Sequence, residues 1–491
     1  MSAPPEELKP RGLPGYGVAA LIFGAVCPLL VAAGVATEGF AVTGLENIPL
    51  LFIALFVMLV IFSVGYLAMA KHMHTVGAFY VFVTRGLGRP VGIAAGLVAI
   101  VAYSALYYGL YGAFGPGMHD LVVTNAHVDV PWYVWALGAW LIVAIVGAVR
   151  IDFAARILAA LVFLEITVAV LLSVRGLLHP HGNTVSFAPF HLSGLGSVTA
   201  LTGVSVAILG YVGWEEPPVY QGETRHPIRT MRLVTYGGLA LMVALYALSS
   251  FAFTAHYGPD TQATAARLGP EAFFELGTGW LAFAGRVLFL TSSLGGLLAF
   301  HSVAARYIYF LARDGVLPRA WAVTSSRGAF IAASLIQSAI AFVVILLYAL
   351  GGWDPLTHLF FWLGNLGGFG VFLLAVLTCV SIIFFFARNM RGENLWTAFI
   401  APLFSGMALA VGVCAVYANF GTLLGTSGRP VDVLRNIYVA PVVLGLIIAG
   451  WLYWRRPGTW SGLGQEGRIR IVPNTEGLSP TDGRHAKEGV S

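Results

Sequence analysis

Charged residues are scarce in this chain. Asp, Glu, Lys and Arg together make up 10% of its 491 residues, whereas 58% of the residues are hydrophobic. A soluble domain carries about 25% charged residues. A water-soluble fold of this length could not hide so much apolar surface. The composition therefore excludes an ordinary soluble protein and indicates that lipid is the natural solvent.

The chain also lacks the usual sequence signs of an ATP-driven pump or an enzyme. None of its three lysines, Lys9, Lys71 and Lys487, precedes Ser or Thr, so no phosphate-binding Gly-Lys-Ser/Thr is present. The three cysteines lie far apart and form neither a metal-ligand spacing nor a disulfide framework. We find no His-Glu-x-x-His and no Asp-rich diphosphate motif. We expect no enzymatic activity, no cofactor, no metal site and no nucleic-acid partner.

Long apolar runs dominate instead. A membrane-spanning helix needs about 20 predominantly apolar residues. Twelve runs are read as spans: 17–40, 48–70, 90–118, 132–149, 155–175, 196–222, 233–256, 279–311, 328–350, 356–386, 396–419 and 436–454. The sequence thus predicts an all-α integral membrane protein of about twelve helices. Because the first run is long enough to span, we expect it to be retained as a helix and not removed as a signal.

Three regions follow from this pattern. Residues 1–16 form a polar N-terminal segment, 17–455 the membrane domain, and 456–491 a polar, Gly-rich tail that we expect to be disordered. The short stretch 77–88 (GAFYVFVTRGLG) is amphipathic and is predicted to be an interfacial helix before the third span.

Basic residues set the predicted orientation. With the N-terminus in the cytoplasm, most Lys and Arg fall in inside loops. The outside loops keep only Arg175, Arg267, Arg429 and Arg435. An even number of spans places both termini in the cytoplasm.

The first span carries a proline in its middle. Residues 24–28 read GAVCP, and Pro28 has no N–H and clashes with the preceding turn. The helix should be kinked or open there, and any freed backbone group needs a partner from protein, water or ligand. A plain proline kink between packed helices is the alternative interpretation.

The sixth span is interrupted more strongly. Residues 210–218 read GYVGWEEPP, with two Gly, two carboxylates and two Pro in one apolar run. Breaks in helices 1 and 6 are typical of an inverted repeat of five helices, with the substrate site between the breaks near the membrane midplane. Half-helix ends offer N–H groups to a carboxylate and C=O groups to an ammonium, which suits a zwitterionic amino acid.

Other polar residues lie inside predicted spans. Glu165 interrupts the apolar run of span 5, and a carboxylate in a membrane span is a candidate for a functional role. A structural hydrogen bond to a neighbouring helix is the alternative. Ser292 and Ser293 in span 8 are candidate cation ligands, or hydroxyls that hold helices together. His301 is either a proton relay or a hydrogen-bonded core residue.

Three motifs in order resemble one known family. The stretch 213–215 (GWE) with 222–230 (GETRHPIRT) is similar to a Gly-aromatic-Glu … Glu-x-x-Asn-Pro-x-Arg-Thr pattern. Residues 305–307 (ARY) with 312–318 (ARDGVLP), and 77–80 (GAFY), resemble two further segments. Together they identify the chain as similar to the bacterial amino-acid permeases of the amino acid–polyamine–organocation superfamily, over about 17–455.

The resemblance implies a leucine-transporter-type fold, with helices 1–5 and 6–10 as inverted repeats and 11 and 12 outside them. It also implies that Glu215 helps to couple gate movement to protonation. The substrate-binding residues that it implies are Ala25, Val26, Cys27, Pro28, Leu29, Tyr211, Val212, Gly213, Trp214 and Glu215. The predicted ion-coupling residues are Glu165, Glu215, Ser292 and Ser293.

Two positions depart from the family pattern. Relatives often have Gly-Ser-Gly in the opened part of helix 1, where this chain has Val26, Cys27 and Pro28. We therefore expect that this chain binds the substrate carboxylate differently from those relatives, or that its substrate is not a standard α-amino acid. Glu165 stands where several relatives place a lysine, which reverses the charge.

The predicted function is secondary active transport of amino acids or related amines across the bacterial cytoplasmic membrane by alternating access. The coupling ion would be H+ or Na+, with proton symport favoured, and Tyr211 and Trp214 would wall or gate the site. An exchanger without net ion coupling and a transporter-derived sensor are the alternatives. Oligomeric state and the identity of the substrate are left open.

Overall fold

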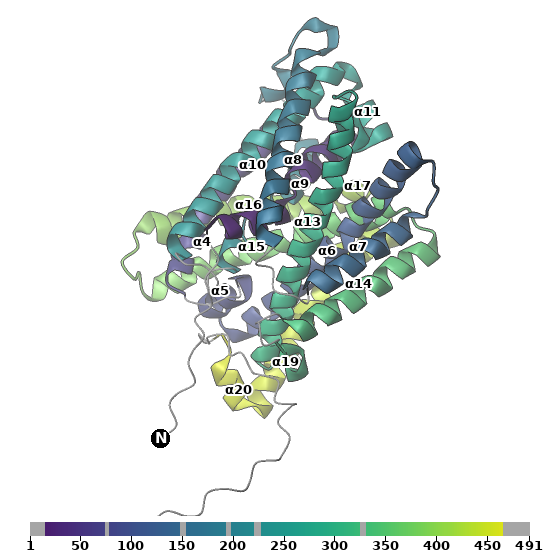
Figure 1. Cartoon of the computed structure of the whole chain (residues 1–491). Helices are drawn as coiled ribbons and strands as arrows, with labels where there is room; N and C mark the ends of the chain where they lie inside the picture. The colour runs from purple at the N-terminus through teal and green to yellow at the C-terminus, as the bar shows by residue number, and fades with distance from the viewer. Residues whose placement is uncertain are drawn as a thin grey trace, which may run out of the picture.

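The architecture is helical throughout the described part of the chain. The structure is a computed structural model that describes residues 15–73, 78–147, 154–192, 198–219, 227–324 and 330–464. Over these ranges the regular elements are helices, with no strand among them. Figure 1 shows long helices that cross one another in a single body, with α20 at the lower end and α11 near the upper end.

The helices fall where the apolar runs predict spans. The described residues contain ten helices long and apolar enough to cross a membrane, and two shorter apolar helices, Trp132–Gly147 and Thr199–Tyr211. Together they account for the twelve predicted spans. After the broken first span come α4 (Ile48–Lys71), α6 (Arg89–Ala126), α7 (Trp132–Gly147), α8 (Ala154–Leu178), α9 (Val198–Tyr211), α10 (Pro227–Tyr257), α13 (Trp280–Arg313), α14 (Ile331–Gly351), α15 (Trp362–Arg388), α16 (Ala401–Ala418) and α19 (Val439–Arg455).

The first span is divided into four pieces. They are α1 (Gly15–Val26), α2 (Pro28–Leu30), the π-helical turn η1 (Val31–Val35) and α3 (Ala36–Thr43). Two short helices, α11 (Thr261–Leu268) and α12 (Glu271–Phe274), lie between α10 and α13. Of these, α11 packs on α3, and α12 packs on η1 and α13.

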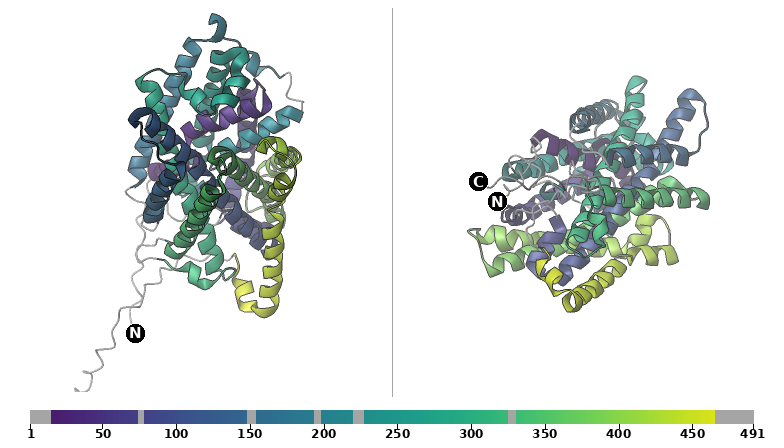
Figure 2. Two further views of the ribbon diagram at one scale, coloured as in Figure 1. Left: turned by 90° about the vertical axis from the view of Figure 1, so that its right-hand side faces the viewer. Right: turned by 60° about the horizontal axis from the view of Figure 1, so that its bottom comes forward.

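Helix contacts follow the predicted repeat of five. Helices five spans apart meet: α3 with α9, α4 with α10, α6 with α13, and α7 with α14. The contact of α1 with α8 in the first half is matched by that of α9 with α15 in the second. Such pairing is what two superimposable five-helix halves produce. Beyond the repeats, α16 packs on α15 and α4, and α19 runs along α6 toward α20 (Figure 2).

One predicted element is placed differently. The segment predicted to be interfacial forms α5 (Ala78–Leu87), which is packed between α6 and α15. Its polar groups find partners in protein: Tyr80 donates to Asp314 Oδ2 at 2.9 Å, and Ser381 Oγ donates to the Phe82 carbonyl at 2.6 Å. A methyl group on Gly86 would lie 2.6 Å from the Cα of Ser381, so only glycine allows this approach. The amphipathic pattern therefore reflects burial against two helices and not a lipid interface.

A small charged cluster ties two ends of the helices together outside the spans. Glu393, between α15 and α16, accepts a hydrogen bond from Lys71 Nζ at 3.0 Å and pairs with His72 Nε2 at 3.0 Å. Partial burial works to raise the pKa of Glu393, but the hydrogen bonds and positive charges of Lys71 and His72 lower it further. The net pKa of Glu393 lies below the ordinary value of a glutamate, so its carboxylate is ionised and keeps its contacts with Lys71 and His72 at neutral pH.

The terminal regions are described only in part. Residues 1–14 of the predicted N-terminal segment and 465–491 of the predicted disordered tail lie outside the described residues. The start of that tail forms a short helix, α20 (Pro457–Gly462), contrary to the disorder expected for 456–491. Arg89 explains the order, because its Nη2 donates to the Ser461 carbonyl at 2.9 Å and its guanidinium lies over the Trp460 ring.

Candidate functional site

Helix 1 is open at the predicted position. The first half-helix ends at Val26, and Cys27 takes a left-handed conformation with φ 50° and ψ 65°. Residues other than glycine seldom adopt a positive φ. Pro28 then begins the second half-helix, in the first-turn position that suits a residue without an N–H. The predicted break in helix 1 is confirmed.

The break leaves backbone carbonyls unused. Cys27 N–H still donates to the Phe23 carbonyl at 3.2 Å, but no N–H of the next turn reaches back across Cys27 to Ala25 or Val26. The Cys27 thiol lies 3.2 Å from the Gly24 carbonyl and 3.4 Å from that of Ala25. Because thiols are weak donors, these carbonyls keep most of their capacity to accept. The end of the first half-helix is thus a cluster of acceptors.

Helix 6 is also broken where predicted. Its first part, α9, ends at Tyr211, and a turn follows in which Gly213 has φ 109°. Trp214 N–H donates to the Tyr211 carbonyl at 3.1 Å, and Glu216 N–H to the Gly213 carbonyl at 3.2 Å. Both hydrogen bonds join residues three apart, as in a 3-10 helix, and not four apart as in an α-helix.

Gly213→Ala should destabilise this break. The φ of Gly213 is unfavourable for any residue with a side chain, and a methyl group there would lie 3.1 Å from Val26 Cγ2 across the site. Strain of this kind costs about 1–3 kcal/mol. We expect a lower melting temperature in detergent and weaker substrate binding than for Gly237→Ala, whose added methyl meets nothing within 4 Å. Equal stability and binding in the two variants would show that the turn is not constrained.

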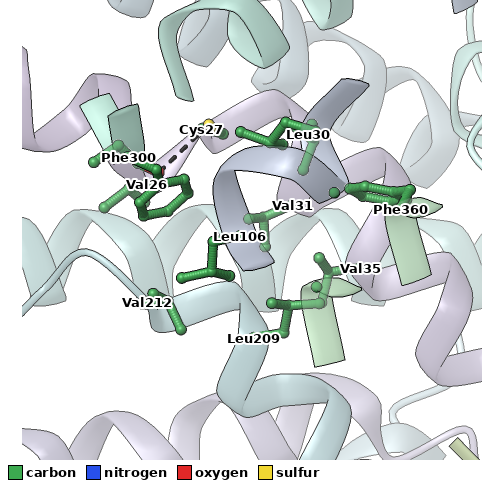
Figure 3. A pocket seen from close by; sticks show the side chains of 14 residues that line it. Val26, Cys27, Leu30, Val31, Val35, Leu106, Leu209, Val212, Phe300 and Phe360 are labelled. Atoms are coloured by element: carbon green, nitrogen blue, oxygen red, sulfur yellow. Dashed lines mark hydrogen bonds between the residues drawn. The ribbon is translucent and has the colours of Figure 1, made fainter. Parts of the chain in front are cut away.

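A small cavity lies between the two breaks (Figure 3). The volume of this cavity that the centres of water molecules can occupy is about 40 Å³, which is space for only a few waters. Its walls come from helices 1, 3, 6, 8 and 10. The lining residues are Ala25, Val26, Cys27, Leu30, Val31, Val35, Leu106, Gly109, Leu110, Leu209, Val212, Phe300, Phe360 and Gly364.

Only some predicted binding residues line this cavity. Ala25, Val26, Cys27 and Val212 do so. The other six, Pro28, Leu29, Tyr211, Gly213, Trp214 and Glu215, lie at the breaks but outside the lining. The individual lining residues from helices 3, 8 and 10 were not predicted, because apolar residues at helical spacing there look like any other core residues.

The two aromatic candidates for gates are packed into protein. Trp214 is buried between Phe62 and Phe372, with ring centroids 5.7 Å and 5.4 Å away. Tyr211 donates to the Phe52 carbonyl at 2.9 Å. Both side chains therefore anchor helix 6 to its neighbours in this conformation and do not face the cavity.

Glu215 holds the helix 6 break to two other helices. One carboxylate oxygen accepts from the Tyr103 hydroxyl of α6 at 2.6 Å, and the other from Gly213 N–H at 2.9 Å. Tyr66 of α4 donates to the Glu215 backbone carbonyl at 2.9 Å. The side chain is fully buried, so the bonds from Tyr103 and Gly213 replace water that the carboxylate has lost.

Its neighbour Glu216 is equally buried but unsatisfied. Neither of its carboxylate oxygens has a hydrogen-bond partner within the described part of the chain. Its charged neighbours are Glu215 and Arg306. We did not single out this residue from the sequence, although two adjacent glutamates in an apolar span are themselves a signal.

The predicted ion-coupling residues come together in part. Glu165 of α8 is buried, and its carboxylate faces the hydroxyls of Ser292 and Thr291 and the Leu29 N–H. Glu165 Oε2 and Ser292 Oγ do not complete a hydrogen bond of normal geometry. Ser293, in contrast, donates to the Phe289 carbonyl of its own helix at 2.8 Å. Glu215 belongs to the helix 6 break and not to this group.

Two further polar contacts complete the surroundings. Glu38 of α3 is buried and accepts from Asn365 Nδ2 of α15 at 2.7 Å, which joins the second half of helix 1 to helix 10. His301 is hydrogen-bonded to Ser334 at 2.8 Å and packs against Tyr107, which supports the core interpretation of this histidine.

Comparison with known proteins fits this geometry. A sequence model of a family described as amino acid permease matches residues 16–448, which is most of the chain. The chain belongs to the amino acid permease family. No curated protein matches it. Membership places this permease in the amino acid–polyamine–organocation superfamily and makes it a multi-pass membrane transporter and not an enzyme.

Proposed function

We propose that this permease is a secondary active transporter that moves amino acids or related amines across the bacterial cytoplasmic membrane by alternating access. One observation carries the proposal. The breaks of helices 1 and 6 lie together at one small cavity, where the chain leaves the helical path at Cys27 and again after Tyr211. Paired broken helices at mid-membrane are how such transporters bind a small substrate without exposing it to both sides.

The substrate would bind through backbone groups. The acceptor carbonyls at Ala25 and Val26 suit an ammonium group, and the positive end of the second half-helix at Pro28 suits negative charge. The side chains from helices 3, 6, 8 and 10 would enclose the remainder of the molecule.

The contact between Glu215 and Tyr103 joins the two parts that would move. Helices 1 and 6 form one part, and helices 3, 4, 8 and 9 the other. Rocking of one part against the other exposes the cavity to each side in turn. Because the Tyr103 hydroxyl lies on the second part and the carboxylate on the first, this bond has to change during the cycle.

Coupling would use a buried carboxylate. An ionised glutamate inside a membrane span costs several kcal/mol unless it is paired. A proton on Glu165 or Glu215 removes that cost in one conformation, and the difference between conformations ties proton flow to substrate flow. A Na+ ion between Glu165 and Ser292 would act in the same way. Both termini would lie in the cytoplasm, as the distribution of Lys and Arg predicts.

Uptake by purified protein in proteoliposomes tests this proposal. The assay offers a pool of labelled amino acids and amines under an imposed proton gradient, a sodium gradient or no gradient. Uptake of one class, increased by an inward proton gradient, supports proton symport. Uptake that needs only a preloaded internal substrate points to the alternative, an exchanger. No uptake above protein-free liposomes under any condition would contradict transport and favour a sensor.

A further inference from the structure

We propose that the cavity takes a small aliphatic amine, which it recognises by its ammonium group and apolar body without needing a carboxylate. This inference rests on the proposed function and narrows its substrate class.

The lining is apolar almost throughout. Of the fourteen lining residues, only Cys27 has a polar side chain, and its thiol is turned toward the Gly24 and Ala25 carbonyls of its own helix. Phe300 and Phe360 lie on opposite sides of the view in Figure 3, with aliphatic side chains between them. A second charged or hydroxylated group on the substrate would lose its water and gain no partner here.

Two carboxyl groups, those of Glu165 and Glu216, lie beside the cavity, and Arg306 lies beside Glu216. The carboxyl groups of Glu165 and Glu216 are the ionisable neighbours of Cys27 that affect its thiol electrostatically. No Lys, Arg or His stands among the lining residues, all of which belong to the described part of the chain. This arrangement favours a cation over an anion, because the unused carbonyls at Ala25 and Val26 present negative partial charge and an ionised Glu165 would add to it.

Donors for a carboxylate are already engaged. At the helix 6 break, Gly213 N–H is bound by Glu215, and the Val212 and Trp214 N–H groups donate to carbonyls. At the helix 1 break, Pro28 has no N–H, and the Leu29 N–H faces the Glu165 carboxylate. Glu165 thus occupies the position where the second half-helix would otherwise attract a substrate carboxylate.

At most one donor in the first turn is left, the N–H of Leu30. A carboxylate has two oxygens and about four acceptor sites, so one N–H leaves it largely unpaired in an apolar cavity. An unpaired buried carboxylate is strongly unfavourable. A molecule with an ammonium group and no carboxylate avoids this cost altogether.

Three matched ligands, valine, isobutylamine and 3-methylbutanoate, separate the contributions of the ammonium group and the carboxylate to binding. Isobutylamine is valine without its carboxylate, and 3-methylbutanoate is valine without its ammonium group. Binding to the full-length protein in lipid nanodiscs is measured by titration calorimetry, because the neutral form of a small amine crosses lipid unaided and would confuse an uptake assay. Putrescine adds a second charge as the fourth ligand.

We expect isobutylamine to bind at least as tightly as valine, and 3-methylbutanoate and putrescine not to bind measurably. Valine binding without isobutylamine binding would overturn the inference and leave the transport function intact. Binding of putrescine as tight as that of isobutylamine would also overturn it. If no ligand binds, the proteoliposome assay with the pool of labelled amino acids and amines separates two cases. Uptake of another substrate overturns only this inference, whereas no uptake contradicts the proposed function too.

A glycine in the wall provides a structural test. A methyl group on Gly364 would lie 3.4 Å from Leu209 Cδ2, an ordinary contact, so Gly364→Ala should fold while narrowing the cavity. A methylene-sized change in an apolar pocket alters recognition by about tenfold or more. We expect isobutylamine affinity to fall about tenfold and methylamine affinity to change little.

Gly450→Ala is the matched control, because its added methyl meets nothing within 4 Å. If Gly364→Ala does not fold, Leu209→Ala enlarges the same wall and should shift preference toward 3-methylbutylamine. Unchanged selectivity in a folded wall variant would show that the cavity is not where the amine binds.

Discussion

Glu215→Ala is expected to reduce the initial rate of substrate uptake by at least about 100-fold. The change removes two hydrogen bonds to a carboxylate and leaves the Tyr103 hydroxyl and Gly213 N–H buried without a partner. A hydrogen bond to a charged group contributes about 1.5–3 kcal/mol, and 1.4 kcal/mol is a factor of ten. Initial rates in proteoliposomes, normalised to the amount of inserted protein, measure the effect.

Two companion variants show which bond matters. Tyr103→Phe removes only the bond between helices 3 and 6 and should lower uptake by about tenfold. Glu275→Ala removes a carboxylate from an exposed position in the loop before α13 and should change uptake little. Near-normal uptake by Glu215→Ala would mean that the helix 6 break is held by other contacts.

Glu165→Gln is expected to keep substrate binding measurable and to abolish the effect of a proton gradient on uptake. Glutamine has nearly the shape of a glutamate but cannot exchange a proton. Its amide can still meet the Ser292 hydroxyl and the Leu29 N–H that face Glu165. The measurement is the initial uptake rate at several external pH values, with and without an imposed gradient.

Serine variants distinguish a proton from a sodium ion at this position. Ser292 faces Glu165, whereas the hydroxyl of Ser293 is bound within its own helix. If Na+ is the coupling ion, Ser292→Ala should raise the sodium concentration needed for half-maximal uptake, and Ser293→Ala should have a smaller effect. Unaltered pH dependence in Glu165→Gln would remove this residue from proton coupling.

The interruptions in the two helices could be predicted because they depend on local chemistry. Pro28 cannot donate to the preceding turn, and Gly213 permits a φ that other residues avoid. Both effects act within a few residues and are visible in the sequence. The length and spacing of the apolar runs similarly predicted the twelve spans.

The residues that line the cavity, and those that hydrogen-bond to Glu215, could not be predicted in the same way. Leu106 and Phe360 line the cavity because helices 3 and 10 approach the breaks, and nothing local marks them. Tyr103 and Tyr66 meet Glu215 across more than a hundred residues of chain. The segment of α5 was misplaced for a related reason, since an amphipathic pattern does not tell whether protein or lipid covers the apolar face.

Protection of Cys27 by substrate tests the central claim most directly. Cys27 lines the cavity at the helix 1 break, whereas Cys379 is buried in α15 and Cys414 is exposed on α16. A Cys379→Ala, Cys414→Ala protein in proteoliposomes is treated with a small thiol reagent, with and without saturating substrate. The account predicts that the site is exposed in turn to each side, so Cys27 is labelled, and that substrate slows the labelling. Labelling at an unchanged rate with substrate, or no labelling under any gradient, would contradict a substrate site between the breaks of helices 1 and 6.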